Sequence, residues 1–590
     1  MSEHDDSKVP TVEGAADANA RQKALAHLAN DEEAMRASYG KASLKAIVND
    51  RYAFGCSLFA AMGGLLFGID QGLVSVILVM PKFLERFHQI DGTKDVSAGF
   101  HKGILTAMIE LGALVGAMLA GFVADKFSRR GAIRTGVVFF IIGSAIQTGS
   151  ISYDMLVVGR LIGGIGIGFL SNTCPVYISE LSPPHIRGIL LGLEEFAIVG
   201  GICLAYYVTY GTRFIDSEWC YRLPFLLQIV PGFILMVGAF ILPPSPRWLA
   251  MQGRSEESLM TLAKIRRRHP DDALVQAEWL EIRGEAELHD EIRRERHPTH
   301  QSGSFKDQVA LELWGWVDTL RPGCWKRTVI GILLMAFQQL VGINALIYYA
   351  PTLFEQLGLN YDDRLNLSGV ANLCQLAGVF ISFFFIDKIG RKPLLTFGSV
   401  GMTVCMIIVG VLTAVFSNDW PAHKPEARAA VAFLNIYMVV FGLSWGPIPW
   451  SMPSELFPSS LRAKGVAWST VSNWLFNFII GLIVPPLVDA TGYGAFVFFA
   501  CWAFVSALFA IFIVPETKGK TLEQLDTLFN DRTGTADEER RTRINNRLAA
   551  EASARLAERS SAYSADGTTQ QRVGKAADDD AEDQKLPSLA

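Results

Sequence analysis

The sequence is poor in charge: only 19% of its 590 residues are Asp, Glu, Lys or Arg, whereas 50% are hydrophobic. Such an apolar chain, with a mean hydropathy of +0.27, is typical of a polytopic membrane protein and argues against several soluble domains. The net charge of −5 is small and its charges are unevenly placed. We therefore expect no nucleic acid partner.

Other signals are missing as well. The eight cysteines are scattered, mostly inside apolar runs, and none forms a CxxC pair, so we interpret them as packing residues. No metal-ligand spacing and no nucleophile with a base are present, so the sequence predicts no enzyme activity, no metal and no cofactor. Residues 1–51 are polar and charged. They do not form a cleavable signal peptide, and we expect the first apolar helix to direct membrane insertion.

Long apolar runs fill most of the rest of the chain. About twelve runs of roughly 18 to 25 residues are each long enough to cross about 30 Å of hydrocarbon. They lie near residues 52–80, 101–124, 132–150, 155–177, 189–211, 223–243, 328–354, 367–386, 394–416, 430–457, 461–487 and 493–514. The predicted fold class is an all-α membrane protein with about twelve transmembrane helices in two pseudo-symmetric halves of six.

Basic residues in the short loops predict the orientation. They fall on one side of the predicted spans, which the positive-inside rule makes cytoplasmic. Both termini then lie in the cytoplasm, and the plasma membrane is the expected location. The predicted domains are a disordered N-terminal tail (1–50), a six-helix bundle (51–243), a charged helical linker (244–326), a second six-helix bundle (327–514) and a mostly disordered C-terminal tail (515–590).

Two patterns recur in both halves. An Asp-Lys-x-x-Arg loop begins at Asp125 after the second span and at Asp387 after the eighth. A Glu-x-x-Pro pattern that precedes an arginine begins at Glu180 after the fourth span and at Glu455 after the tenth. Six-span halves related by a parallel repeat are typical of transporters whose site lies between the halves, near the membrane midplane.

The stretch 336–349 places amides inside an apolar run. Gln338, Gln339 and Asn344 would each cost several kcal/mol in lipid without partners. They either join helices or face a ligand, and an amide, which donates and accepts, suits a hydroxyl-rich neutral solute. Together with Tyr348 they do not share one helical face. The sequence therefore predicts a break or bend near Gly342.

Opposite charges also lie inside predicted spans. Asp70 is in the first span and Arg160 in the fourth, and a mutual pair offsets the cost of each. A carboxylate that is ionised beside Arg160 and takes up a proton when released would be a proton switch; a static structural pair is the alternative. Glu110, Glu194 and Glu195 are further carboxylates within spans, and the sequence leaves their roles open.

Five motifs in order resemble the sugar porter family of the major facilitator superfamily, in the style of fungal monosaccharide transporters. They are GR at 159–160, PPSPRWL at 243–249, QQLVGIN at 338–344, GPIPW at 446–450 and PETKG at 515–519. The resemblance implies a solute site to which Glu195 is assigned because it stands where many members carry a sugar-binding Gln. The candidate solute-binding residues are Gln338, Gln339, Asn344, Tyr348, Asn372, Trp450, Asn473, Trp474 and Glu195.

The resemblance also implies roles for charged residues. In proton-coupled members an Asp and an Arg at the positions of Asp70 and Arg160 couple transport to protons, and facilitative members lack the acid. Charged residues at the cytoplasmic helix ends form an inner network that closes the inside; topology signal and helix capping are the alternative. The gate candidates, with four predicted pairs, are Asp125–Arg130, Glu180–Arg187, Asp387–Arg391, Glu455–Arg462 and the single residue Arg247.

Two departures from regular patterns complete the prediction. Gly446, Pro447 and Pro449 predict an irregular tenth span, because prolines remove donors and kink helices. Pro244 stands where the family usually has a Glu, so one partner of the inner network is missing.

The function predicted is a transporter that carries a monosaccharide, a hexose, across the lipid bilayer with a proton by alternating access. A facilitative uniporter, a sugar receptor that transports little, and a disaccharide, polyol or sugar acid as solute are the alternatives. Glu195 disfavours an anionic solute because like charges repel.

Overall fold

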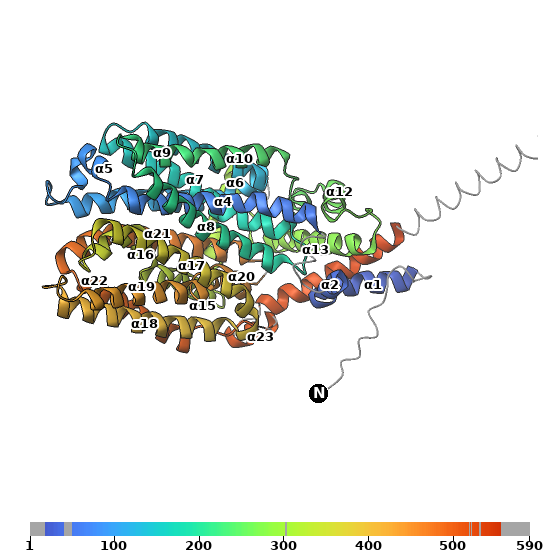
Figure 1. The fold of residues 1–590 in the computed structure, drawn as a ribbon. Helices are drawn as coiled ribbons and strands as arrows, with labels where there is room; N and C mark the ends of the chain where they lie inside the picture. The colour runs from blue at the N-terminus through green and yellow to red at the C-terminus, as the bar shows by residue number, and fades with distance from the viewer. Residues whose placement is uncertain are drawn as a thin grey trace, which may run out of the picture.

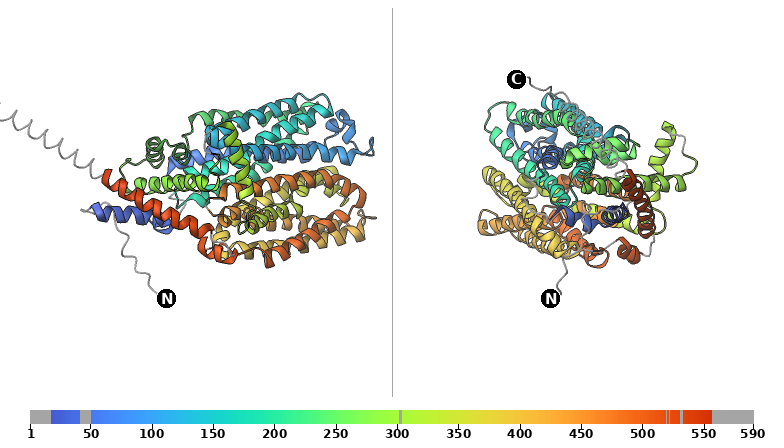
Figure 2. Two further views of the ribbon diagram at one scale, coloured as in Figure 1. Left: turned by 180° about the vertical axis from the view of Figure 1, so that it is seen from behind. Right: turned by 90° about the vertical axis from the view of Figure 1, so that its right-hand side faces the viewer.

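The chain forms two helical layers that lie side by side (Figure 1). The structure is a computed structural model that describes residues 18–40, 50–300, 304–458, 460–518, 520, 522–529 and 533–555. In these ranges the regular structure is helical, without strands. Figure 2 shows the same two layers from behind and from one end. The all-α prediction is confirmed.

The first layer, called the first half below, contains the helices from α4 to α10. Its elements are α4 (Arg51–Ile77), α5 (Pro81–Arg86), η2 (His88–Ile90), α6 (Ala98–Thr148), α7 (Tyr153–Leu181), α8 (Arg187–Thr212), α9 (Trp219–Leu227) and α10 (Ile229–Ile241). The second half contains α15 (Trp325–Leu340), α16 (Ile343–Glu355), α17 (Tyr361–Ile389), α18 (Arg391–Phe416), α19 (Lys424–Leu443), α20 (Ile448–Leu456), α21 (Arg462–Thr491) and α22 (Gly494–Phe512).

Helix α6 holds two membrane crossings. It has 51 residues and would be about 77 Å long if straight, more than twice the hydrocarbon thickness. Ser128 breaks it with a φ of 73°. Before Ser128, α6 runs parallel to α7, because Gly112 lies against Leu161 and Gly116 against Ile165. After Ser128 it runs antiparallel to α7, because Gly136 lies against Gly166 and Gly143 against Gly163. The chain therefore reverses at Ser128.

Eleven described helical segments are long and apolar enough to span a membrane. Because α6 crosses twice, they make twelve crossings, as the sequence predicts. Large apolar side chains such as Phe233, Phe240, Val411 and Phe512 are more than half exposed. Apolar exposure on this scale marks a surface that another apolar phase covers, and here the lipid bilayer covers it.

Two predicted helix interruptions are confirmed. The seventh crossing is split between α15 and α16, and Gly342 lies between them in the left-handed region with a φ of 100°. The tenth crossing is split between α19, which ends at Leu443, and α20, which begins at Ile448. Residues 444–447 form the turn between them. Backbone carbonyls at both interruptions are released from helical hydrogen bonds and become available to side chains.

Shorter helices pack at one end of the two layers, called the linker side below (Figure 1). They are α1 (Ala18–Asn30), α2 (Glu32–Tyr39), α11 (Pro246–Met251), α12 (Ser255–Arg266), α13 (Ala273–Arg296), α14 (Phe305–Asp318), α23 (Leu522–Phe529) and a helix at 533–555. Residues 18–30, 32–39 and 533–555 are helical in the structure, within the segments that the sequence assigned to the two tails.

The tail helices are ordered by burial against the linker, and we call this assembly the linker-side bundle. Leu25 of α1, Leu262 of α12, Leu280 of α13 and Leu548 of the 533–555 helix belong to one apolar cluster, and each of these four side chains is completely buried. Each tail carries too few apolar residues to fold by itself. The tails fold because together with the linker they complete one core.

Candidate functional site

The predicted amides converge at the two helix interruptions of the second half. The Nε2 atom of Gln338 donates to the carbonyl oxygens of Trp445, at 2.8 Å, and Gly446, at 3.0 Å. These carbonyls belong to the turn between α19 and α20. Asn473 on α21 donates through Nδ2 to Gln338 Oε1 at 2.6 Å. Gln338 thereby joins α15, α21 and the interrupted tenth crossing.

The break at Gly342 brings a second pair of amides together. Asn344 Nδ2 donates to Gln339 Oε1 at 2.5 Å, although a straight helix would place the two side chains on different faces. Gln339 Nε2 lies 3.5 Å from Gln338 Oε1, which links both pairs into one amide cluster. All four amides are at most 4% exposed. Each of the four side chains then makes at least one hydrogen bond within the cluster that a hydroxylated solute could replace.

Tyr348, one helical turn after Asn344 on α16, connects this helix to the first half. Its hydroxyl donates to a carboxylate oxygen of Glu110 on α6 and accepts a hydrogen bond from Gln71 Nε2 on α4 at 2.6 Å. Asn477 on α21 donates to the other oxygen of Glu110 at 2.9 Å. We call this set of four side chains the seam network, because Gln71 and Glu110 belong to the first half and Tyr348 and Asn477 to the second.

The sequence reasoning missed two members of the seam network and left a third without a role. Gln71 directly follows Asp70, and Asn477 is one helical turn after Asn473. Those spacings were the available signals. They became informative only once the two halves were placed against each other.

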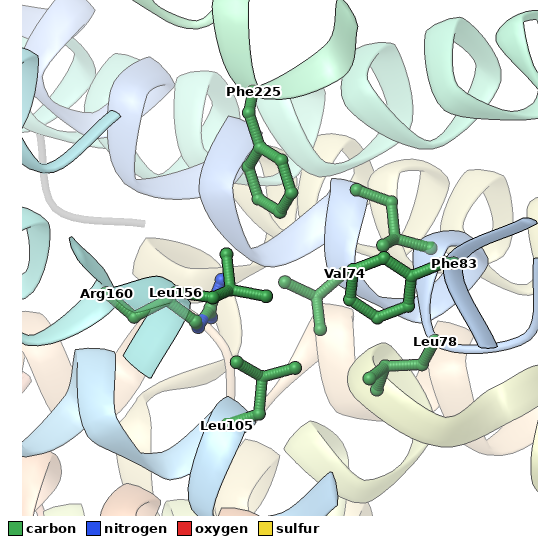
Figure 3. A pocket seen from close by; sticks show the side chains of 8 residues that line it. Val74, Leu78, Phe83, Leu105, Leu156, Arg160 and Phe225 are labelled. Atoms are coloured by element: carbon green, nitrogen blue, oxygen red, sulfur yellow. The ribbon is translucent and has the colours of Figure 1, made fainter. Parts of the chain in front are cut away.

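The predicted charged pair is present. Arg160 Nη2 lies 3.4 Å from Asp70 Oδ2, and each residue is 1% exposed. The contact is incomplete, because Asp70 Oδ1 and Arg160 Nε and Nη1 have no hydrogen-bond partner. A small hollow lies beside the guanidinium, lined by apolar side chains that include Val74, Leu156 and Phe225 (Figure 3). Asp70 and Gln71 are neighbours, so the pair adjoins the seam network.

Glu195 also reaches the second half. Its Oε1 atom lies 3.4 Å from the position that a Cβ atom would take on Gly446, whose carbonyl accepts from Gln338. Glu195 is half-buried, whereas its neighbour Glu194 is buried and lies against Gly64 of α4. Of the two carboxylates on α8, Glu195 is therefore the one that adjoins the amide cluster.

The remaining predicted solute residues differ in their surroundings. Trp474 is buried and its ring packs edge-on against Phe67 of the first half, with ring centroids 5.0 Å apart. The indole nitrogen of Trp474 has no hydrogen-bond partner. Asn372 is buried on α17 and Trp450 is half-buried on α20. Within the described residues, neither of these two side chains hydrogen-bonds to the amide cluster.

On the linker side of the first half, Arg129 is the centre of the ion pairs. It contacts Asp125 at 3.1 Å and Glu180 at 2.9 Å. Arg130 instead donates to the carbonyl of Leu242 at 2.8 Å. The predicted Asp125–Arg130 pair is therefore wrong by one residue, because the sharp turn at Ser128 directs Arg129 and not Arg130 between the two acids.

The second half has a matching arrangement at the same end. Arg391 contacts Glu455 at 2.9 Å, and Thr517 donates to the other oxygen of Glu455 at 2.5 Å. Glu516 accepts from the backbone N–H groups of Arg391 and Lys392, each at 3.1 Å. An anion at the first turn of α18 stabilises that helix end. The predicted partner of Arg391, Asp387, has a side chain outside the described residues.

No acid is available to Arg247 at position 244, which is Pro, and Arg247 instead pairs with two acids of the linker. It contacts Glu281 at 3.3 Å and also pairs with Glu285, both on α13. Arg187 is the first residue of α8, and Arg462 is the first residue of α21. The described ion pairs of the gate candidates join elements of one half, or the linker with itself or a half. The predicted direct lock between the two halves is therefore not formed by them.

A buried ion pair holds the linker-side bundle together. Arg266 contacts Glu278 at 2.5 Å and donates to the carbonyl of Leu181, at the end of α7, at 2.7 Å. Tyr39 of α2 donates to Glu278 at 2.7 Å. Burial raises the pKa of the Glu278 carboxyl, but Arg266 and the Tyr39 hydroxyl outweigh burial and hold this pKa below its usual value. The N-terminal segment, the linker and α7 thus meet at one ionised carboxylate.

Nothing in the arrangement resembles a metal centre. Among the residues that the structure describes, no three His, Cys, Asp or Glu side chains are grouped closely enough to hold a metal ion. What the site offers is hydrogen-bond donors and acceptors in the second half, a charged pair in the first, and a network that joins them.

The fold and this site define a polytopic membrane carrier with a polar site between two six-helix halves. A model of the sugar (and other) transporter family matches residues 56–529, which is most of the sequence. The chain belongs to this family, within the major facilitator superfamily, and the resemblance found in the sequence motifs is confirmed.

Curated relatives agree with this assignment. The chain is 32% identical over 499 residues to the MFS glucose transporter mfs1 of Aspergillus flavus, a match that covers 80% of this chain and 88% of that protein. It is also 32% identical over 491 residues to sugar transport protein 7 of Arabidopsis thaliana, covering 81% and 90%.

Solved structures show the same fold. The partially occluded inward-open xylose transporter XylE from E. coli matches with a TM-score of 0.65 at 28% identity, over 80% of this chain and 100% of that chain. The proton:xylose symporter XylE bound to 6-bromo-6-deoxy-D-glucose matches with a TM-score of 0.65 at 30% identity, over 82% and 100%.

Proposed function

We propose that this sugar transporter carries a monosaccharide together with a proton by alternating access. The observation that carries the proposal is the adjacency of two sites of different chemistry. The amide cluster of the second half suits a neutral hydroxylated solute. Helix α16, which carries Asn344 of this cluster, reaches the first half through the bond between Tyr348 and Gln71, the residue next to the buried Asp70–Arg160 pair. Coupling requires such a connection, because solute and proton must favour the same state of the carrier.

The solute is a hexose bound by residues from both halves. Gln338, Gln339, Asn344 and Asn473 exchange their mutual hydrogen bonds for bonds to sugar hydroxyls, which keeps these buried groups paired in either state. Tyr348 adds a phenol hydroxyl. Asn372 and Glu195 add an amide and an acceptor. Trp450 and Trp474 offer apolar ring faces to the C–H side of the sugar. Relatives named as glucose transporters support a hexose.

Asp70 is the proton-coupling group. While Arg160 is 3.4 Å away, the positive charge favours the ionised carboxylate, and separation of the two helices removes that support inside an apolar environment. The carboxylate then takes up a proton. The incomplete contact, with one carboxylate oxygen and two guanidinium nitrogens unpartnered, is consistent with a pair that separates during the cycle.

The linker side is the cytoplasmic side of the plasma membrane, and its ion pairs form the inner gate. Basic loops gather at this end, as the positive-inside rule requires. The gate residues are Asp125, Arg130, Glu180, Arg187, Arg247, Asp387, Arg391, Glu455 and Arg462, with Arg129 as the bridging residue. Because the described pairs stay within one half or reach the linker, the linker transmits closure between halves.

Reconstituted uptake tests the proposal. Wild-type protein in proteoliposomes with an inward proton gradient is expected to accumulate labelled glucose, whereas Asp70→Asn loses accumulation and retains exchange of labelled for unlabelled sugar. Asp154→Asn is the matched control, since Asp154 lies exposed on the same helix as Arg160. Accumulation by Asp70→Asn at the wild-type level would show that Asp70 is not the coupling group, and a wild type that exchanges sugar without accumulating it would indicate a facilitator. A competition panel of sugars against labelled glucose identifies the solute.

A further inference from the structure

The buried centre of the molecule contains more acid than base. Asp70, Glu110 and Arg160 are each 1% exposed and act on one another, so two carboxyl groups share this cluster with one guanidinium. If both acids were ionised, the cluster would carry one uncompensated negative charge. A buried unpaired charge costs several kcal/mol in a membrane protein. The cluster is neutral when one of the two acids carries a proton.

The contacts identify which acid that is. Arg160 touches Asp70 and leaves its Nε and Nη1 atoms without partners. Within the described part of the chain, the side chains that hydrogen-bond to Glu110 are the neutral Tyr348 and Asn477. The titratable and charged groups that face Glu110 are Asp70 on α4, Arg160 on α7, and Tyr348 and Tyr349 on α16. The acid in contact with the cation stays ionised, and the other one is neutralised.

The hydrogen bonds of the seam network accommodate both protonation states of Glu110. With Glu110 ionised, Tyr348 donates to it and accepts from Gln71. When a proton binds to the carboxylate oxygen next to Tyr348, the new O–H group donates to the phenol oxygen. Tyr348 can then turn its own hydrogen toward Asn477 Oδ1, which lies 3.4 Å away. No buried group loses its partner in the exchange.

We propose that Glu110 is a second proton-binding site of this carrier, and that it holds the proton while Asp70 remains ionised beside Arg160. Because Glu110 hydrogen-bonds to Tyr348 and Asn477 of the second half, protonation of Glu110 changes the hydrogen bonds between the two halves. The participation of this proton in coupling rests on the proposed symport, whereas the protonation of Glu110 is argued from the contacts alone.

Infrared difference spectroscopy of the full-length protein in lipid vesicles at neutral pH tests the assignment. The spectrum of wild type minus Glu110→Gln is expected to show the C=O stretch of a protonated carboxylic acid. A carboxylate band in its place would overturn the proposal. Glu194→Gln is the matched control, because Glu194 is another buried carboxyl, and the Glu110 band must persist in that variant.

A second spectrum tests whether Glu110 is protonated because Asp70 already pairs with Arg160. In an Asp70→Asn background, Arg160 has lost its partner, so Glu110 is expected to ionise and its acid band to become a carboxylate band. An acid band that is unchanged in this background would contradict the charge balance argued here. If Glu110→Gln does not fold, Tyr348→Phe serves instead: it removes the hydrogen bond and shifts the Glu110 band, whereas an unshifted spectrum overturns the proposal.

The spectra and the uptake assay test the two proposals independently. Should the wild-type protein not accumulate glucose under a proton gradient, the proposed symport is wrong, while the difference spectra still report the proton on Glu110. Should the spectra show an ionised Glu110, this inference is wrong, and Asp70 remains the coupling group.

Discussion

The Tyr348 hydroxyl donates a hydrogen bond to the Glu110 carboxylate across the contact between the two halves. Tyr348 belongs to the interrupted seventh crossing, and Glu110 to the first crossing of α6. In the proposed cycle, Tyr348 therefore lies between the helix that carries the proposed solute site and the acidic residues of the first half. The following predictions test this relationship and the structure that supports it.

Replacing Tyr348 by Phe should weaken the contact between the two halves at the seam network. A hydrogen bond between neutral groups contributes about 0.5–1.5 kcal/mol, so the ratio of closed to open carrier should fall by about twofold to tenfold. Distances between spin labels on the outer ends of α4 and α16 would measure that population. Tyr349→Phe is the control, because Tyr349 donates to the Gly481 carbonyl at 2.7 Å within the second half. Equal opening in both variants would contradict the prediction.

Gly342→Ala should destabilise the solute site. Gly342 has a φ of 100°, and an added Cβ would lie 2.6 Å from the Phe499 ring. Backbone strain alone costs about 1–3 kcal/mol, so the variant should unfold at a lower temperature and bind sugar more weakly. Gly200→Ala, where nothing lies within 4 Å of an added Cβ, should leave both quantities unchanged. Thermal unfolding in detergent and glucose competition measure the difference.

The linker-side bundle should weaken in acid. The Glu278 carboxyl has a lower pKa when folded than its usual 4.5, so its stabilisation is present above the unfolded pKa and is lost as the pH falls through the folded pKa. We expect Glu278→Gln to lose about 3–5 kcal/mol at neutral pH, because Arg266 stays buried without a counter-charge. The variant should also lose this pH dependence.

Hydrogen exchange of α12 and α13, corrected for the intrinsic effect of pH, measures this stability. Glu256→Gln is the control, because Glu256 is exposed and lies 3.5 Å from Arg555, and exposed pairs contribute about 0–1 kcal/mol. A wild-type bundle that exchanges equally at all pH values would show that Glu278 does not stabilise it.

Leu548→Ala should release the N-terminal helices. Leu548 is completely buried against α1 and the linker, and the truncation of a buried leucine costs about 2–5 kcal/mol. Exchange should accelerate in α1 as well as in the 533–555 helix, because both complete one core. Arg543→Ala removes only an exposed contact with Glu291 and should change neither. Unchanged exchange in α1 would contradict the shared core.

Local chemistry made part of this site predictable. The interruption at Gly342 followed from amides that no single helical face could hold, and the Asp70–Arg160 pair followed from the cost of two opposite charges inside apolar spans. The ion pair of Arg129 was not predictable, because a one-residue turn at Ser128 decides which of two adjacent arginines faces Glu180. The tail helices were missed because neither tail is apolar enough to indicate a core by itself.

By itself, the sequence determined the class of fold, the twelve crossings, the two interrupted helices and the chemistry of the amide cluster. These follow from the hydrocarbon thickness and from the need to pair polar groups in lipid. Tertiary structure decided that Glu110 and Gln71 meet Tyr348 and Asn477, and that both tails join the linker. These contacts link residues hundreds of positions apart, and no periodicity in a sequence specifies how one half is placed against the other.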